Sequence, residues 1–393
     1  MPLRLKPKKE IPLLNHHHWI FSGAVASLSD DVPNGHITQV LSSDGLFLGQ
    51  AYINRRSNIM GRVISFDHGP IPDILHKKIS SAWRLRKDLF KNDTNCYRII
   101  NSEGDGIPGL IVDRYDSVLV IQSTTLGIDH LLPILTQELL KVAESEDKRE
   151  WSIYLKSTSP SRHSEGLSEQ IKWLSGEVQP SITVLEDGMR FQVITEKSQK
   201  TGLFLDQREM RRLVSTMVKD KTVLNCFSYT GGFSLATLKG KARHVTSVDI
   251  SKDAISQLEI NLTLNSIPTG LHTSHVADVF EFLKSKEKLD SDFVILDPPA
   301  FAKTKLDVPE AMRGYRELNS LAISKMPPRS WLLTSSCSYH VDPILFQKLI
   351  FQAANEAKRS ARIMERHRLA SDHPININHP EGEYLKSLLL FIE

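Results

Sequence analysis

The residues of this sequence best suited to chemistry are an acid and a cysteine that each follow an apolar run. Asp297 ends one such run and precedes Pro298 and Pro299, while Cys337 follows the run 331–336. Paired prolines make a stiff turn that would hold the acid in place. A cysteine thiolate is a strong nucleophile, and a carboxylate beside it can stabilise charge or move a proton. The pair favours covalent catalysis over the commoner role of a lone cysteine as a small buried side chain.

A second group of acids has the spacing of a nucleotide-cofactor site. An apolar run leads into a turn with Gly231 and Gly232, where the backbone can approach a ligand closely. Asp249 ends the next run, 18 residues after Gly231, where a doubly wound fold sets a carboxylate against ribose hydroxyls. Asp278 ends a further run and could accept a hydrogen bond from an adenine amine. Each acid alone would be an ordinary strand-end residue, but together with Asp297 they favour a bound cofactor. The turn lacks the G-x-G-x-x-G pattern, which argues against a nicotinamide cofactor.

These residues need a sheet whose strand ends lie together, and the second half of the chain has that pattern. Past about residue 200, strand-like and helical segments alternate, which predicts an α/β fold: a mostly parallel sheet covered by helices on both faces. Because such sheets bind ligands at the carboxyl ends of their strands, Asp297 and Cys337 should be neighbours there. The expected strands are 223–227, 245–250, 293–297, 331–336 and 384–392, and the expected helices are 207–219, 231–240, 251–265, 305–326 and 342–358.

The first half of the chain has a different pattern of strand-like and helical segments, which predicts two smaller domains. Apolar runs at 37–41 and 46–53, separated by Asp44-Gly45, indicate a hairpin in a small β-rich module. A helical pattern follows from 72 to 90. Beyond it, strand-like runs and a second helix indicate an α+β domain, with strands at 97–100, 110–113 and 118–121 and the helix at 128–144. We therefore divide the chain into residues 1–72, 73–196 and 197–393.

The Asp297-Pro298-Pro299 string resembles the Asp/Asn-Pro-Pro signature of methyltransferases that act on nucleobases. This resemblance, with the acid spacing above, predicts an S-adenosylmethionine-dependent methyltransferase. Cys337 then suggests a particular reaction. Carbon 5 of cytosine is too weak a nucleophile to take a methyl group unaided, and a thiolate adding to carbon 6 supplies the missing electron density. The group that lowers the thiol pKa or takes its proton is not evident from the sequence.

Longer strings make the chain similar to a known family, the bacterial 23S ribosomal RNA cytosine-C5 methyltransferases of the RlmI type. The resemblance covers nearly the whole chain. It departs from the family at 326–330, where relatives usually have a glycine pair, and at Ala300, where they often have lysine. The matching strings are His18–Val25, Glu103–Leu110 with Asp113-Arg114, Lys200–Arg208, Asn225–Phe233, Asp297–Phe301, Ser336–Ser338, Asp372–Pro374 and Glu381–Lys386.

The resemblance implies an N-terminal PUA domain, a middle α+β domain and a C-terminal class I methyltransferase domain. It implies that Cys337 is the nucleophile, since no cysteine stands beside Asp297. The residues expected to touch the substrate are Pro298, Pro299 and Phe301. The residues expected to bind the cofactor are Phe204, Asp206, Gln207, Arg208, Phe227, Tyr229, Thr230, Gly231, Asp249, Ile250, Asp278, Val279 and Asp297.

Two other functions stay open on the sequence. One is methylation of a guanine or adenine nitrogen, which would use Asp297-Pro298-Pro299 without a covalent intermediate. The other is an RNA-binding assembly factor that binds cofactor but no longer turns over. The intact set of Asp249, Asp278, Asp297 and Cys337 argues against the second, because a decayed enzyme need not keep all four.

Composition sets the remaining limits. A net charge of +3 permits an RNA partner without requiring one. Three scattered cysteines fit a reduced, cytoplasmic protein, and we find neither a secretory signal nor an apolar run long enough to span a membrane. A homodimer is compatible with the sequence. The run His16-His17-His18 is expected in an exposed loop, and no metal site is predicted.

Overall fold

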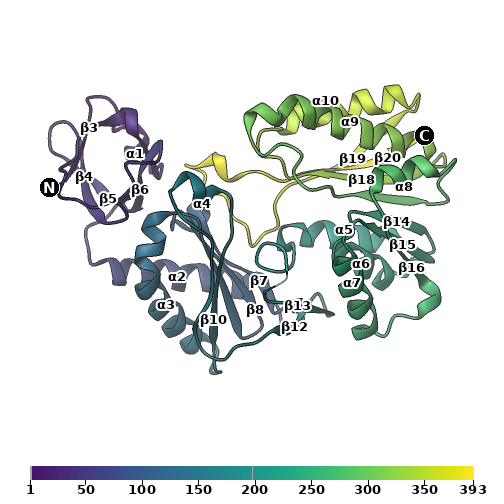
Figure 1. Cartoon of the computed structure of the whole chain (residues 1–393), viewed down its shortest axis with the longest axis horizontal. Coiled ribbons are helices and arrows are strands. Elements are labelled where there is room, and N and C mark those ends of the chain that lie inside the picture. The colour runs from purple at the N-terminus through teal and green to yellow at the C-terminus, as the bar shows by residue number, and fades with distance from the viewer. Residues whose placement is uncertain (1, 197) are drawn as a thin grey trace. The chain divides into compact units, whose positions relative to one another are not determined.

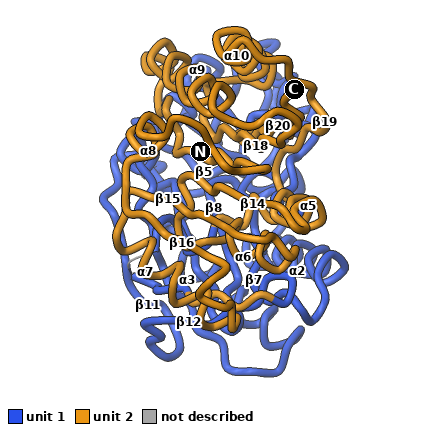
Figure 2. The backbone as a smooth tube through the Cα atoms, turned by 90° about the vertical axis from the view of Figure 1, so that its right-hand side faces the viewer, with its two compact units in different colours: residues 1–188, 193–203, 371–382 blue, residues 189–192, 204–370, 383–393 orange. Residues whose placement is uncertain are grey.

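A computed structural model of the chain describes residues 2–196 and 198–393. The chain forms two compact units, each built from more than one stretch of sequence (Figure 2). Unit 1 comprises residues 1–188, 193–203 and 371–382, and unit 2 comprises residues 189–192, 204–370 and 383–393. The domain boundaries at 72/73 and 196/197 stay a prediction. Residues 1 and 197, at which two of those domains begin, lie outside the described residues.

The N-terminal part of unit 1 is a six-stranded sheet with the order β2-β6-β5-β4-β1-β3. The predicted hairpin is confirmed: β4 pairs with β5 in antiparallel register, and Gly45 takes a left-handed φ of 95° in the connecting turn. The elements are β1 (Leu3–Leu5), α1 (Ile11–Leu14), β2 (Trp19–Phe21), β3 (Val25–Ser27), β4 (Ile37–Leu41), β5 (Phe47–Ile53) and β6 (Ile59–Ser65).

The run His16-His17-His18 is predicted to lie in an exposed loop, and for His18 this prediction is wrong. The His18 side chain is 3% exposed, and its Nδ1 lies 2.7 Å from the carbonyl oxygen of Val63. The backbone of His18 also accepts a hydrogen bond from the Val63 amide, so the residue extends the pairing of β2 with β6. Burial lowers the pKa of His18 to about 4, which keeps the ring neutral at physiological pH.

The rest of unit 1 is an α+β layer structure that agrees with the predicted helices and strands. A five-stranded sheet has the order β11-β10-β9-β8-β7, and helices α2 and α3 share a large apolar core with it. The elements are α2 (Ile71–Leu89), β7 (Cys96–Asn101), β8 (Leu110–Tyr115), β9 (Val118–Ser123), α3 (Leu126–Glu146), β10 (Ser152–Ser157), α4 (Ser161–Ser164) and β11 (Gln170–Ser175). A separate two-stranded sheet of β12 (Ser181–Glu186) and β13 (Met189–Ile194) follows, and residues 189–192 of β13 are assigned to unit 2.

A late stretch of the chain, residues 371–382, belongs to unit 1 although it lies between segments of unit 2. Buried Asp372 fixes it there: its carboxylate accepts a hydrogen bond from the Arg98 amide at 2.8 Å, and its carbonyl accepts one from Arg86. The Pro374 carbonyl approaches so closely that a Cβ on Gly104 would lie 1.9 Å from its oxygen. Only glycine fits at position 104 without moving this segment.

Unit 2 contains a seven-stranded sheet of order β16-β15-β14-β17-β18-β20-β19. All neighbours along β16-β15-β14-β17-β18 are parallel, and β20 runs antiparallel to both β18 and β19. Helices α8, α9 and α10 share one core with the sheet, and α5 packs with α6 on its other side (Figure 1). The strands are β14 (Thr222–Cys226), β15 (His244–Asp249), β16 (His272–Val276), β17 (Phe293–Leu296), β18 (Ser330–Ser336), β19 (Ala361–His367) and β20 (Lys386–Ile392). The helices are α5 (Arg208–Met217), α6 (Gly232–Lys239), α7 (Lys252–Leu264), α8 (Val279–Ser285), α9 (Val308–Lys325) and α10 (Pro343–Glu356).

The predicted α/β fold of this half is confirmed, with each expected strand or helix within a few residues of its observed bounds. Buried parallel strands read as continuous apolar runs, which made them easy to find. Strand β19 was not predicted, because it is an edge strand whose exposed residues include Arg362, Glu365 and Arg366. Among the described residues, no helix is both long enough and apolar enough to cross a membrane.

Candidate active site

The turn between β14 and α6 has an unusual backbone that positions main-chain groups at the sheet edge. Phe227, Tyr229 and Gly231 all have positive φ, at 59°, 47° and 88°. A Cβ on Gly231 would lie 2.7 Å from the Leu258 side chain, so helix α7 leaves no room for a larger residue. Asn261 of α7 holds the turn by donating to the Thr230 carbonyl at 2.9 Å. The turn is therefore shaped by tertiary packing as well as by its two glycines.

Asp249, at the end of β15, faces this turn. One carboxylate oxygen accepts a hydrogen bond from the Tyr229 amide and the other accepts one from the Ser251 amide, both at 2.9 Å. Each oxygen keeps a second lone pair, so the carboxylate can still accept ligand hydroxyls. The next residue, Ile250, is 70% exposed, which places an apolar side chain beside the acid. An acid next to an exposed apolar surface suits the ribose and the ring of a nucleoside.

Asp278 has a local structural role that its position in the sequence does not reveal. It is the N-cap of α8, where one carboxylate oxygen accepts the Glu281 amide at 3.0 Å. The segment before it is tied to β15 because the Ala277 amide donates to the Asp249 carbonyl. Asp278 is exposed and keeps its other oxygen for a ligand, whereas Val279 is 2% exposed and packs in the core.

The segment before α5 brings predicted cofactor residues against the sheet edge. Gln207 donates from Nε2 to a carboxylate oxygen of Asp297 at 2.9 Å, and the Phe204 ring contacts the Tyr229 ring edge-on at 5.1 Å. Asp206 accepts a hydrogen bond from the Tyr384 hydroxyl at 2.6 Å. Arg208, the first residue of α5, is fully buried. The segment 204–208 thus joins Asp297 and the β14 turn in one constellation.

The residues at this edge fit a nucleoside cofactor such as S-adenosylmethionine. The Ser228 hydroxyl is buried in the turn and has no hydrogen-bond partner among the described residues, as expected for a group that meets a ligand. The Gly231 position admits no side chain, and Asp249 supplies a carboxylate at a strand end. These three features together provide the polar and close-approach contacts that ribose and its attached groups require.

Cys337 follows β18 and lies at the same edge. Strands β17 and β18 are parallel with Leu296 opposite Thr334, so the residues that follow each strand emerge side by side. The half-buried Cys337 thiol lies 3.9 Å from the Pro298 carbonyl oxygen, next in sequence to Asp297. The structure therefore brings Cys337 together with the Asp-Pro-Pro turn, as the sequence analysis expects.

A buried serine holds this arrangement. The Ser338 hydroxyl accepts a hydrogen bond from the Ala302 amide at 3.1 Å and lies 2.9 Å from the Tyr315 hydroxyl of α9. Phe301 packs its ring on Tyr315 at 4.6 Å. Pro298 is buried and Pro299 is exposed. Ser338, the residue after Cys337, thus connects the end of β18 to the loop after Pro299 and to α9. Tyr315 contributes to this arrangement of the site, but no sequence pattern had marked it.

Comparison with known proteins places the chain among methyltransferases. A family profile described as an S-adenosylmethionine-dependent methyltransferase matches residues 160–388, and a PUA-like domain profile matches residues 3–66. The ribosomal RNA large subunit methyltransferase I of Vibrio cholerae is 38% identical over 381 residues, which is 95% of each chain. That of Cronobacter sakazakii is 36% identical and covers 98% of this chain and 97% of its own. The chain belongs to the ribosomal RNA large subunit methyltransferase I family.

Solved structures agree on the fold of this methyltransferase family member. A protein from Streptococcus mutans described as a SAM-dependent methyltransferase has a TM-score of 0.83 at 23% identity, with both chains fully covered. Another solved structure, of a methyltransferase in complex with SAH, has a TM-score of 0.84 at 24% identity, again over the full length of both chains. The predicted fold class is confirmed: a PUA-like N-terminal domain and a C-terminal S-adenosylmethionine-dependent methyltransferase domain. The predicted cofactor, S-adenosylmethionine, is that of the family.

The methyltransferase domain also contains functional candidates that sequence reasoning missed. Lys386, the first residue of β20, is buried and donates to the carbonyls of Ser338 and Tyr384. Burial lowers the pKa of Lys386 to about 8, and the Cys337 side chain opposes that shift by its electrostatic interaction with the lysine. The sequence offered two weak signals, a Lys in an apolar strand pattern and its place in the matching string Glu381–Lys386, while its partner Ser338 lies 48 positions earlier.

The two other cysteines have different surroundings. Cys226, at the end of β14, is fully buried in the sheet core, and burial raises the pKa of its thiol. Cys96 is buried at the start of β7 in unit 1. Of the three, Cys337 alone is partly accessible, which is the property that a nucleophile needs.

Proposed function

We propose that this protein methylates carbon 5 of a cytosine in large-subunit (23S) ribosomal RNA through a covalent bond between Cys337 and carbon 6 of the base. The observation that carries the proposal is the half-buried Cys337 thiol at the carboxyl edge of the sheet, 3.9 Å from the carbonyl of Pro298 and beside the Asp297 turn. Ribosomal RNA is the substrate in the names of the relatives, and the PUA-like domain supports an RNA partner.

The cysteine makes up for the low reactivity of the target carbon. The Cys337 thiolate adds to carbon 6, and the electron pair of the 5,6 double bond becomes available at carbon 5. S-adenosylmethionine supplies an electrophilic methyl group on its sulfonium. Transfer of the methyl group to carbon 5 would leave S-adenosylhomocysteine. Carbon 5 then loses its proton to a general base, and the carbon–sulfur bond to Cys337 breaks. The double bond re-forms and the thiolate is restored.

Asp297 is proposed to act on the polar edge of the base. A carboxyl group there can stabilise the charge that develops on N3 and the exocyclic amine during addition. Gln207 fixes its orientation through the 2.9 Å hydrogen bond to one carboxylate oxygen. Pro298, Pro299 and Phe301 are proposed to contact the base, and the stiff Pro-Pro turn keeps these contacts in place.

The other residues of the constellation are proposed to bind S-adenosylmethionine. Asp249 would accept the ribose hydroxyls, Ile250 would cover one face of the adenine, and Asp278 would accept the adenine amine. The remaining residues proposed to border the cofactor are Phe204, Asp206, Gln207, Arg208, Phe227, Tyr229, Thr230, Gly231, Val279 and Asp297.

Lys386 is proposed to favour the reactive form of the cysteine. A positive charge beside a thiol stabilises its thiolate. Lys386 donates to the carbonyl of Ser338, the residue after Cys337, and the electrostatic interaction between the two side chains opposes the burial-induced fall of the lysine pKa. Lys386 therefore acts through Cys337 and is a positioning residue.

Nucleoside mass spectrometry tests the proposal directly. Large-subunit RNA is incubated with labelled S-adenosylmethionine and the wild-type, Cys337→Ala or Cys226→Ala protein. Labelled 5-methylcytidine from the wild type and Cys226→Ala, and none from Cys337→Ala, is the expected result. Label on another nucleoside, or equal label from all three proteins, would favour nitrogen methylation without a covalent intermediate. Absence of label on every RNA tested would favour the non-catalytic assembly factor.

An RNA containing 5-fluorocytidine isolates the covalent step. Fluorine at carbon 5 cannot leave as a proton does, so the adduct should persist after methyl transfer. The expected result is a wild-type protein–RNA complex that survives denaturation and is absent with Cys337→Ala. A persistent complex with both proteins would assign the nucleophile to another residue.

The homodimer stays a prediction, which a solution mass measurement can check.

A further inference from the structure

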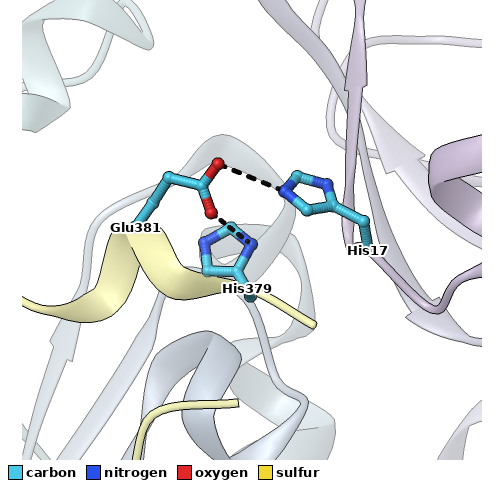
Figure 3. A group of neighbouring side chains, drawn as sticks. All are labelled: His17, His379 and Glu381. Carbon is cyan, nitrogen blue, oxygen red and sulfur yellow. Dashed lines mark ion pairs between the residues drawn. The ribbon is translucent and has the colours of Figure 1, made fainter. Parts of the chain in front are cut away.

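Two histidines and a glutamate converge in unit 1, and none of them belongs to the sheet-edge constellation of unit 2. His17 lies between α1 and β2, while His379 and Glu381 come from the late segment 371–382 (Figure 3). His17 Nε2 is 3.4 Å from one Glu381 oxygen, and His379 Nδ1 is 3.6 Å from the other. One donor atom from each of the three side chains lies within 4.8 Å of the others. These distances bring three ligand-type atoms around one point.

Two of these potential metal-ligand atoms make no hydrogen bond to any other described residue. His379 is 2% exposed, and its Nδ1 has no hydrogen bond among the described residues. The same holds for Glu381 Oε2, the oxygen that faces it. Buried polar atoms without hydrogen bonds are uncommon and often mark a missing ion or water.

The scaffold around the cluster is rigid on both sides. Trp19 packs edge-on against the His379 ring at 4.5 Å and donates its indole N–H to Glu103 at 2.8 Å. The segment that bears His379 is anchored by the Asp372 hydrogen bonds to Arg98 and Arg86. A set of ligands held this way loses little freedom when an ion binds.

A cavity of about 480 Å³ adjoins the cluster. His17 and Glu381 both line it, together with Lys9, Trp19 and Phe21. The cavity gives room for a water molecule or a small exogenous ligand next to the two side chains. A metal ion at the cluster would therefore have a position open to solvent.

We propose that His17, His379 and Glu381 bind a divalent transition-metal ion, with zinc as the best match. Two imidazoles and one carboxylate form a set that zinc uses with three protein ligands and one open position. Magnesium and calcium prefer sites made only of oxygen, so the two histidines argue against them. The proposal concerns unit 1 alone and does not rest on methyl transfer.

Binding requires one rearrangement that the structure makes explicit. His17 Nδ1 accepts a hydrogen bond from the Trp19 amide at 3.2 Å, so the neutral ring carries its proton on Nε2. Coordination through Nε2 moves that proton to Nδ1 and breaks this hydrogen bond. No proton leaves the ring overall. The lost hydrogen bond makes the site weaker than one whose histidines are already in the metal-binding tautomer.

The ion would cross-link residues 371–382 to the segment before β2. Its ligands, His17 and His379, lie 362 positions apart in sequence, so coordination closes a very long loop. An ion that binds the folded state but not the unfolded one stabilises the fold by mass action. Metal should therefore raise the thermal unfolding midpoint of the protein.

Cobalt titration of the full chain tests the site. The protein carries no histidine tag and is freed of metal with a chelator, and Co²⁺ is followed by its visible absorbance because tetrahedral sites give intense bands. One equivalent is expected to give such bands, and Zn²⁺ is expected to abolish them by displacement. His379→Gln and Glu381→Gln should each weaken Co²⁺ binding at least about tenfold, while His16→Asn, an exposed neighbour in the histidine run, should bind as the wild type does.

A second readout covers variants that fold poorly. Because the Trp19 ring touches the rings of both His17 and His379, bound Co²⁺ should quench Trp19 fluorescence, and Trp19→Phe should remove that quenched component. Glu381→Gln keeps the shape of the side chain, so its circular dichroism should match the wild type. Failure of the wild type to bind one equivalent would overturn the proposal. So would equal binding by wild type and Glu381→Gln, or an equal loss in His16→Asn.

Discussion

The sheet edge of unit 2 and the His17–His379–Glu381 cluster of unit 1 are built in opposite ways. At the sheet edge, each functional residue follows its own buried strand, and the parallel register brings Asp249, Asp297 and Cys337 to one side of the sheet. In the cluster, His17 lies in a loop, and His379 and Glu381 lie just before and within the short 3-10 helix Pro380–Gly382. No sheet register relates these segments, and the pairing depends on the anchoring of residues 371–382.

This difference shows why one site could be read from the sequence and the other could not. An apolar run ending in an acid or a cysteine predicts both the strand and the place of the residue at its end. A histidine in a loop carries no such information. His379 and Glu381 are ordinary residues in sequence, and only the tertiary contacts of Asp372 place them opposite His17.

The largest effect is expected for the nucleophile. Cys337→Ala should lower single-turnover methyl transfer at least about a thousandfold, because removing a covalent nucleophile removes the whole reaction path. Cofactor affinity, measured by calorimetry, should be unchanged. Cys226→Ala is the matched control: it removes the buried cysteine of β14 and should keep most of the activity, with a loss of stability of about 1 kcal/mol. Equal activity losses in both variants would show that Cys337 has no special role compared with the buried Cys226.

The next effect concerns cofactor affinity. Asp249→Ala should raise the Kd for S-adenosylmethionine about 10- to 100-fold, since hydrogen bonds to a charged group contribute about 1.5–3 kcal/mol. The Tyr229 and Ser251 amides also lose their acceptor, so the β14 turn should loosen. Asp253→Ala, an exposed acid in the first turn of α7, should bind as the wild type does. An unchanged Kd for Asp249→Ala would show that this carboxylate does not contribute to cofactor binding.

A third prediction tests the N-terminal module through its buried histidine. His18 has a folded pKa of about 4 against 6.5 in the unfolded chain. The unfolded state therefore binds a proton that the folded state excludes, and stability falls as pH drops from about 6.5 toward 4. At 1.36 kcal/mol per unit of pKa, lowering the pH from 6.5 to 5 should cost about 2 kcal/mol of unfolding free energy.

The variant His18→Asn isolates that contribution. Its side-chain amide can still donate to the Val63 carbonyl but does not titrate. Denaturant unfolding at both pH values should show a smaller acid loss in the variant than in the wild type. His272, whose pKa burial lowers to about 4, titrates in both proteins and cancels in the difference. Identical pH dependence in the two proteins would show that protonation of His18 does not favour the unfolded state.

The smallest effect is expected for the positioning lysine. Lys386→Met should slow methyl transfer about tenfold by removing the charge that favours the thiolate. In the wild type, Lys386 is charged below about pH 8 and loses its charge above it, so the pH–rate profile should fall above pH 8. The variant should lack that fall.

Lys156→Met supplies the control for Lys386. Burial lowers the pKa of Lys156 to about 8 as well, but this lysine lies in unit 1 and donates to the carbonyls of Thr195 and Ser198. Its pH–rate profile should match that of the wild type. A fall above pH 8 that persists in Lys386→Met would assign that titration to another group.

Much of the fold was predictable because local pattern and burial agree. The strands of unit 2 are apolar runs, and the helices α7 and α10 begin directly after Ser251 and Asp342, whose side chains cap them. Prediction failed where exposure hides the pattern, as in edge strand β19, and where tertiary pairing buries a polar residue, as at His18. The capping role of Asp278 was missed because an N-cap acid and a ligand acid look alike in sequence.

By itself, the sequence determined the order of strands and helices in unit 2 and which residue stands at each strand end. Buried parallel strands demand continuous apolar runs, and chain connectivity then assigns Asp249, Asp297 and Cys337 to one edge. Only the tertiary structure decided which side chains surround them. Lys386 comes to Cys337 by the antiparallel pairing of β20 with β18, and His379 comes to His17 by the hydrogen bonds of Asp372. Such contacts depend on the packing of segments far apart in the chain, which no local pattern encodes.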